Sequence, residues 1–193
     1  MALARTVVDA SAERARLELE YLSKVMCIVS SSSTEKVLAL INTWAKFCDG
    51  LLVVTISTDA HMNQTAVLEV NPRTYFLELP KADGQSAGVV TDYRTAAIVW
   101  QYVHDHHTTE YSWFISVPDA TAVIMLHLKR YIALLDYDPK VKNTPVYAGH
   151  PILLPNGMVV NALRAGLLLN KRAIDLLIAG IFKHKGGSSL SFQ

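Results

Sequence analysis

Cysteines, aromatic residues, an excess of one charge and long apolar runs are all scarce or absent in this chain, and their scarcity argues against several classes of protein. Its 193 residues include only two cysteines, 8% aromatic residues, and 18 basic against 17 acidic side chains. Without a basic excess or an aromatic stacking repeat, the sequence predicts no nucleic-acid surface. No apolar run approaches the roughly 20 residues that span a bilayer, and the charged N-terminus does not resemble a signal peptide. Membrane contact is therefore expected only through an anchor absent from this chain.

Apolar residues make up 51% of the sequence, which is enough to build the core of one domain. Continuous apolar runs of strand length alternate with segments of helical periodicity, a pattern typical of a parallel sheet covered on both faces. We therefore predict an α/β fold, a Rossmann-like three-layer α/β/α sandwich with a mostly parallel sheet. The strands expected in this sheet are Val25–Val29, Leu51–Ile56, Ser112–Val117 and Val146–Ala148.

Further elements follow from local signals. Ser32 and Glu35 have the spacing of a capping box that opens a helix reaching Cys48. Val67–Val70 and Tyr75–Leu79 are expected to form short strands, and Asn156-Gly157 predicts a β-hairpin.

Another helix is expected to end in His104, Asp105, His106 and His107. Histidines in a last helical turn suit the helix dipole. A zinc site is the alternative, because His104 and His107 lie on one helix face. No further ligand with matching spacing stands nearby, so the dipole interpretation is favoured.

A buried strand meets the following helix at Pro118–Thr121. In an open α/β sheet this is the rim beyond a strand's carboxyl end, where ligands bind. Here Trp113 and Phe114 form an aromatic pair in the strand, and Thr121 and Val123 follow at fixed spacing. The stretch resembles the Fringe-like β1,3-glycosyltransferases of glycosyltransferase family 31. Within that family it is most similar to the core 1 (N-acetylgalactosaminide) β1,3-galactosyltransferases and their non-catalytic chaperone relative.

The resemblance implies a GT-A-like fold and also a defect in its chemistry. Where the family has three aspartates, this chain reads Pro118, Asp119 and Ala120, a degenerate acidic motif without the metal-binding carboxylates. We therefore expect a non-catalytic, chaperone-like domain with no catalytic residue, metal ion or cofactor. The alternative is an active enzyme that uses UDP-galactose and manganese to build β1,3-linked galactose on O-linked N-acetylgalactosamine.

The resemblance also places the nucleotide-binding loop of the family at the serine run that follows the first strand. Hydroxyls and helix N-terminal amides there are suited to hold a uridine or a phosphate, although serine runs also form ordinary turns and caps. The nucleotide-binding residues expected on this basis are Ser30, Ser31, Ser32 and Asp119.

Composition alone leaves two possibilities for Cys27 and Cys48: two buried free thiols or one bridge. The resemblance favours the bridge, because both residues fall where the family places a disulfide. It also implies the endoplasmic reticulum or Golgi lumen as the location.

The domain organisation expected is a stem-like helical segment at 1–23, a partial glycosyltransferase domain at 24–182, and a flexible tail at 183–193. Family members continue for about another third of a catalytic domain, so the chain is expected to be C-terminally truncated. The missing part would leave an apolar face on the sheet or on the helix Lys171–Ile181, because Leu167–Leu169 and Leu176–Ile181 exceed what one small domain can cover. The expected partner is accordingly a core 1 glycosyltransferase client or a second copy of the chain.

Overall fold

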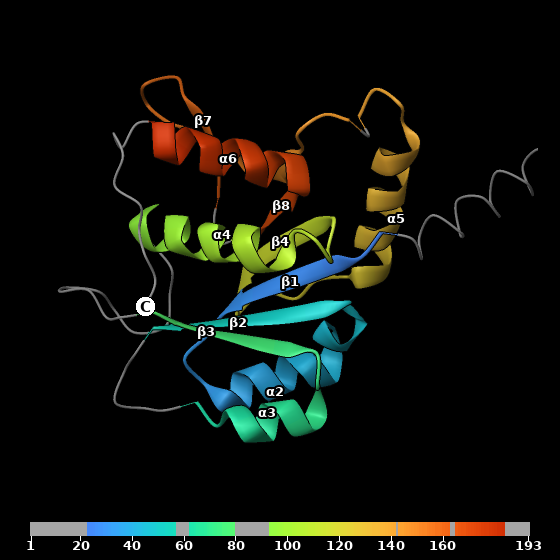
Figure 1. Ribbon diagram of the computed structural model, residues 1–193, viewed down its shortest axis with the longest axis vertical. Helices are drawn as coiled ribbons and strands as arrows, with labels where there is room; N and C mark the ends of the chain where they lie inside the picture. Colours follow the sequence, from blue (N-terminus) through green and yellow to red (C-terminus); the bar gives the residue numbers. More distant parts are fainter. Residues whose placement is uncertain (1–22, 57–61, 80–92, 142, 163–164, 184–193) are drawn as a thin grey trace, which may run out of the picture.

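The computed structural model describes residues 23–56, 62–79, 93–141, 143–162 and 165–183 (Figure 1). The expected stem-like segment, apart from Ser23, and the expected tail, apart from Lys183, lie outside these residues. In chain order the elements are β1 (Val25–Ser30), α2 (Thr34–Thr43), a 3-10 helix (Ala45–Phe47), β2 (Gly50–Ile56), α3 (Gln64–Val70), β3 (Thr74–Leu79), α4 (Tyr93–His107), β4 (Trp113–Pro118), α5 (Met125–Tyr137), β5 (Tyr147–Gly149), β6 (Pro151–Leu153), β7 (Val159–Asn161), β8 (Leu167–Asn170) and α6 (Lys171–Lys183).

A six-stranded sheet in the order β3-β2-β1-β4-β8-β5 forms the centre of the molecule. The strands β1, β2, β3 and β4 run parallel to one another, and β8 is antiparallel to both of its neighbours, β4 and β5. The residues of β1 are buried on both faces, with Val25, Met26 and Cys27 completely inaccessible. This two-sided burial explains why the strand is a continuous apolar run rather than an alternating one.

Helices cover both faces of the sheet (Figure 1). One face packs against α2, α3 and α5 through a core that includes Ile41, Val67 and Ile132. The other face packs against α4 and α6, which lie side by side, through Val103 and Ile174. The predicted three-layer α/β/α sandwich is thus confirmed.

Tryptophan packing follows the sequence-based expectation. Trp44, at the end of α2, and Trp113, at the start of β4, retain 7% and 2% of their accessible surface. Both side chains belong to the core between the sheet and the layer formed by α2, α3 and α5.

The antiparallel strand β8 inserts between β4 and β5, which the sequence did not reveal. Insertion buries Leu167, Leu168 and Leu169, each at most 6% exposed. Of the two places expected for an uncovered apolar face, the sheet is therefore excluded at these residues. On α6, in contrast, Leu176 remains 61% exposed.

Two local predictions are also wrong. Val67–Val70 belongs to helix α3 instead of a strand, because Asn63 caps a helical turn by accepting a hydrogen bond from the Ala66 amide at 3.1 Å. The cap of α2 is Ser33 instead of Ser32, and this helix ends at Thr43, before the short 3-10 turn that leads to Cys48.

Cys27 in β1 and Cys48 after the 3-10 helix form a disulfide with a Cα–Cα distance of 6.0 Å. Both residues are buried, and the sulfur of Met125 lies 4.0 Å from that of Cys48. The bridge therefore fastens the first strand to the connection that leads into β2.

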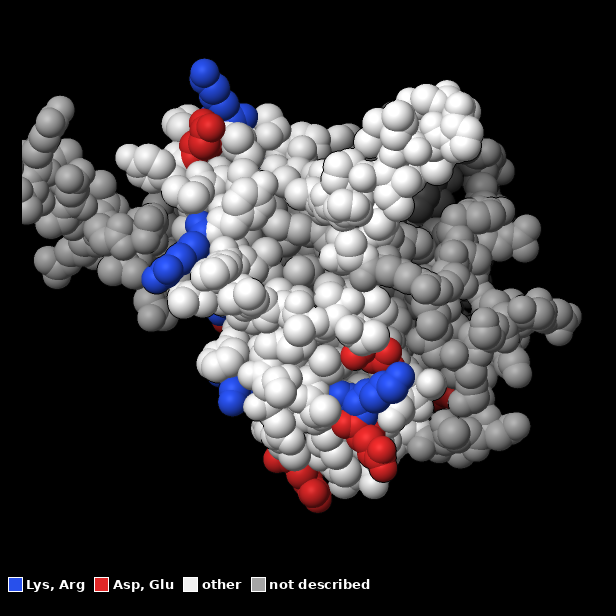
Figure 2. Space-filling model, turned by 180° about the vertical axis from the view of Figure 1, so that it is seen from behind, with Lys and Arg blue, Asp and Glu red and all other residues white. Residues whose placement is uncertain are grey.

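On the described part of the face seen in Figure 2, charged side chains of both signs are scattered among uncharged ones, and some of opposite sign lie beside each other. Within the described ranges, no helix combines the length and the apolar character needed to cross a membrane.

Candidate functional site

The strand order reverses beside β1. The chain adds β2 and β3 on one side of β1 and then returns to place β4 on its other side. In open α/β sheets, ligands bind outside the carboxyl ends of the two strands at such a topological switch point. The carboxyl ends of β1 and β4 are Ser30 and Pro118, which are paired in the sheet register.

Three polar side chains meet at this edge. The hydroxyl of Ser31, which is completely buried, donates a hydrogen bond to Oδ2 of Asp119 at 2.9 Å. The Lys36 ammonium lies 3.2 Å from the same carboxylate oxygen. The Asp119 side chain is only 17% exposed, whereas that of Lys36 is 60% exposed. A sheltered carboxylate is therefore joined to a cation that reaches solvent.

Backbone bonds fix the position of this cluster. The Ser31 amide donates to the Val54 carbonyl of β2 at 3.0 Å, and the Asp119 amide donates to the Ser30 carbonyl at 3.2 Å. Each residue thus continues the hydrogen bonding of the sheet by one position beyond its strand. The spacing of β1 and β4 therefore sets the distance between Ser31 and Asp119.

The N-terminus of α2 opens onto the same edge. Ser33 accepts a hydrogen bond from the Lys36 amide at 3.3 Å, and the Ser33 amide donates to the Ser31 hydroxyl at 3.2 Å. In the first turn of a helix the amides have no intrahelical acceptor, and the helix dipole is positive there. Together with the Lys36 ammonium, this end of α2 is suited to hold an anion.

The structure brings together most of the residues predicted to bind a nucleotide. Ser30, Ser31 and Asp119 meet at the switch point, and Ser32 occupies the connecting turn before α2. Lys36 was not among the residues predicted from the sequence. Its signal was available, because a lysine three residues after a helix cap lies over the first turn and near whatever the helix end binds.

The other two residues of the degenerate acidic motif do not add ligands. Pro118 ends β4, and the exposed Ala120 follows Asp119 in a turn. Lys129 does not point to this edge: its ammonium lies 3.2 Å from Asp49, the residue that precedes β2. A phosphate bound at the switch point would therefore depend on Lys36.

The histidines at the end of α4 are engaged in other contacts. His104 contacts Asp105 at 2.9 Å and Asp175 of α6 at 3.5 Å. His107 is 4% exposed, and burial lowers its pKa below the usual value, with the nearby His106 acting in the same direction. Among the described residues no group of three or more histidine, cysteine or carboxylate side chains is placed to hold a metal. The zinc interpretation thus gains no support.

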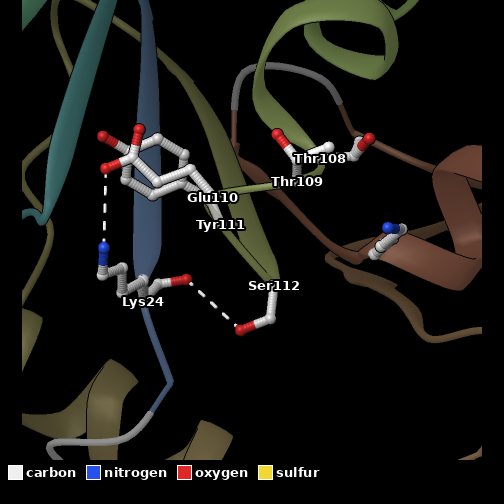
Figure 3. Close-up of a pocket in the computed structure, with 7 residues that line it drawn as sticks. Lys24, Thr108, Thr109, Glu110, Tyr111 and Ser112 are labelled. Atoms are coloured by element: carbon white, nitrogen blue, oxygen red, sulfur yellow. Dashed lines mark hydrogen bonds and ion pairs between the residues drawn. The ribbon is translucent and has the colours of Figure 1, made fainter.

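A shallow depression of about 280 Å³ lies at the opposite, amino edge of the sheet (Figure 3). Two lysines, Lys24 and Lys171, line it. Lys24 is paired with Glu110 at 3.5 Å, and the Thr108 hydroxyl donates to the His104 carbonyl at the end of α4 at 2.8 Å. The neighbouring Tyr111 has a raised pKa because it is buried and hydrogen-bonded to Tyr75. Lys24, Glu110, Thr108 and Tyr111 already have partners within the protein, and we assign no ligand to this depression.

No protein-family model and no curated protein sequence matches this chain. The similar solved structures include the crystal structure of 4-diphosphocytidyl-2C-methyl-D-erythritol synthase from Anaerococcus prevotii. It is 11% identical, with a TM-score of 0.43, over 89% of this chain and 79% of that one. A second structure of a synthase with the same name is 11% identical, with a TM-score of 0.46, over 86% of this chain and 81% of the other.

These comparisons overturn the galactosyltransferase interpretation. Neither a family model nor a curated protein sequence supports a Fringe-like or core 1 relationship. The predicted degenerate, chaperone-like galactosyltransferase and its active alternative are both wrong, and the endoplasmic reticulum or Golgi location can no longer be inferred from a family resemblance. The motif misled because Trp113–Pro118 and its following turn have the composition of many buried parallel strands.

Proposed function

We propose that this chain binds a nucleotide, or another phosphorylated small molecule, at the switch point between β1 and β4. The observation that carries the proposal is the cluster of Ser31, Asp119 and Lys36, held together by contacts of 2.9 and 3.2 Å where the strand order reverses. The topological switch point, the hydrogen bond between buried Ser31 and largely buried Asp119, and the N-terminus of α2 coincide at one place.

Each of the three side chains has a different role in binding the proposed ligand. Lys36 and the first-turn amides of α2 supply positive charge for a phosphate group. The Asp119 carboxylate accepts hydrogen bonds, as a sugar hydroxyl requires, and the buried Ser31 hydroxyl holds this carboxylate in place. Ser30 and Ser32 lie on either side of Ser31 and shape the backbone that the ligand meets.

Lys36 is the residue whose contact must change on binding. Its ammonium now pairs with Asp119, and an arriving phosphate would share or replace that partner. Because Lys36 is 60% exposed, the pair is screened by water and contributes little to folding. The exchange therefore costs the protein little stability.

The disulfide supports an oxidising compartment, such as the endoplasmic reticulum or Golgi lumen, as the place where the chain matures. Both cysteines of the sequence are used in the bridge between Cys27 and Cys48. Such bridges form and persist in oxidising environments and are rare in the cytosol of mesophiles.

The test is a titration of the full chain with nucleoside mono- and diphosphates of each base, and with inorganic phosphate, followed by calorimetry and by the shift in melting temperature. We expect saturable binding by the wild type. Lys36→Gln removes the phosphate partner and should weaken binding by about tenfold or more, equivalent to about 1.4 kcal/mol. Asp119→Asn should weaken binding of nucleosides more than binding of inorganic phosphate.

Lys46→Gln is the matched control, since it removes the same charge from the 3-10 helix that follows the other end of α2. Over the 10 residues of α2 the two ends are about 15 Å apart, so this variant should bind as the wild type does. The proposal fails if the folded wild type binds none of these ligands. It also fails if Lys36→Gln and Lys46→Gln bind with equal affinity.

A further inference from the structure

Asn63, Gln64 and Thr65 form an Asn-x-Thr sequence, the acceptor signal for N-linked glycosylation when the middle residue is not proline. None of the other six asparagines of the chain meets this condition. Asn143-Thr144-Pro145, for example, has proline where a hydroxyl residue is needed. We propose that Asn63 is a glycosylation site and carries an N-linked oligosaccharide.

The structure leaves room for such a modification. Asn63 and Thr65 are both exposed, at the start of α3 on the outside of the helical layer. The Asn63 backbone is fixed, because its amide donates to the Thr34 hydroxyl at 2.9 Å. A sugar attached here would extend into solvent without displacing the core.

The orientation of the Asn63 side chain frees the reacting atom. Its Oδ1 accepts the capping hydrogen bond from the Ala66 amide at 3.1 Å. Because a backbone N–H requires an acceptor, this bond assigns the oxygen to the helix and turns Nδ2 away from it. The cap and the glycan therefore use different atoms of one amide.

The disulfide independently supports glycosylation of Asn63. N-linked glycans are added in the secretory pathway, which is also where disulfides form. The bridge between Cys27 and Cys48 leaves no free thiol. An exposed acceptor signal and a complete set of bridged cysteines are the pattern of a protein that passes through that lumen.

The reaction requires a donor of one chemical class, a polyprenyl-diphosphate-linked oligosaccharide. Asn63 Nδ2 attacks the anomeric carbon of the first sugar, forming a C–N bond. The C–O bond to the diphosphate breaks, the polyprenyl diphosphate leaves with the electron pair, and the amide nitrogen loses one proton. No oxidation or reduction takes place.

The experiment produces the full chain in eukaryotic cells behind a cleavable secretion signal and measures intact mass before and after peptide N-glycosidase treatment. We expect a mass excess that the glycosidase removes, leaving aspartate at position 63. In the same sample, alkylation without reduction should find no thiol, which shows that the chain has passed through an oxidising lumen.

Asn63→Asp keeps the cap of α3, since aspartate caps helices as well as asparagine does, but it removes the acceptor nitrogen. This variant and Thr65→Ala should lose the mass excess, whereas Thr65→Ser should retain it. Asn71→Asp is the control: Asn71 follows α3, and aspartate preserves the oxygen that accepts from the Arg73 amide at 3.1 Å. Unmodified Asn63 in disulfide-bonded wild type, or a glycan that persists in Asn63→Asp, would overturn the proposal.

Discussion

The indole nitrogen of Trp113 donates to both carboxylate oxygens of Asp136, at distances of 3.2 and 3.0 Å. This contact ties the start of β4 to the last turn of α5. Ser23, next to the first strand, donates to the same carboxylate. Asp136 therefore joins three segments that are distant in sequence.

Asp136→Ala should lower the free energy of unfolding by about 1–3 kcal/mol, because it leaves the buried indole N–H without a partner. Asp136→Asn keeps an acceptor oxygen and should lose clearly less. Trp113→Ala also empties part of the core and should cost ~3–5 kcal/mol. Urea unfolding monitored by circular dichroism measures all three. Equal stability of Asp136→Ala and wild type would show that the contact does not matter.

Reduction of the disulfide should destabilise the fold without changing its topology. The bridge joins residues separated by 21 positions, and the chain-entropy estimate for a loop of this size is about 3 kcal/mol. The double variant Cys27→Ala, Cys48→Ala should therefore unfold at lower denaturant concentration than the oxidised wild type. Adding reductant should shift the wild type in the same direction and leave the variant unchanged. A wild type whose midpoint ignores reductant would contradict the prediction.

The buried His107 should make stability depend on pH. Its ring is surrounded by Tyr75, Tyr102 and Tyr111, with centroid distances of 4.6, 5.5 and 6.2 Å, and His106 lies 6.3 Å away. Nε2 of His107 is buried, and no partner for it stands among the described residues. The aromatic surroundings thus disfavour the charged form.

Burial lowers the pKa of His107 below the usual histidine value of 6.5; His106 acts in the same direction, and Glu110 opposes the shift. The unfolded chain then binds a proton more readily than the folded one, so stability is complete above about pH 6.5 and declines as the pH falls below it. His107→Phe should flatten this decline, because phenylalanine fills the aromatic site without titrating. His150→Gln, at an exposed position, should retain it. Melting temperatures of the wild type and both variants, measured between about pH 5 and 8, test this prediction.

Strands with two buried faces were predictable from the sequence alone. β1, β2 and β4 are continuous apolar runs, and each lies within one residue of its predicted bounds. Helix α3 was not predictable in this way. Val67–Val70 is too short and too rich in β-branched residues to show helical periodicity, and the cap at Asn63 decides its form.

The candidate site was predictable only in part. That Ser31 and Asp119 follow strands is visible in the sequence, but that these strands are neighbours is a property of the sheet order. The position of β8 between β4 and β5 depends on long-range pairing for the same reason. Local patterns locate an element along the chain, whereas its neighbours are chosen by packing.

The antiparallel insertion of β8 sets an order of events during synthesis. β5 pairs with β8 and with no other strand of the described sheet. The ribosome synthesises β5 about 20 residues before β8, at a rate of roughly 5–20 residues per second. Until Leu167–Asn170 emerges, β4 is an exposed edge with Trp113 and Phe114 along it. The nascent chain therefore passes through a stage at which a hydrophobic edge strand is open to a chaperone or to a neighbouring nascent chain.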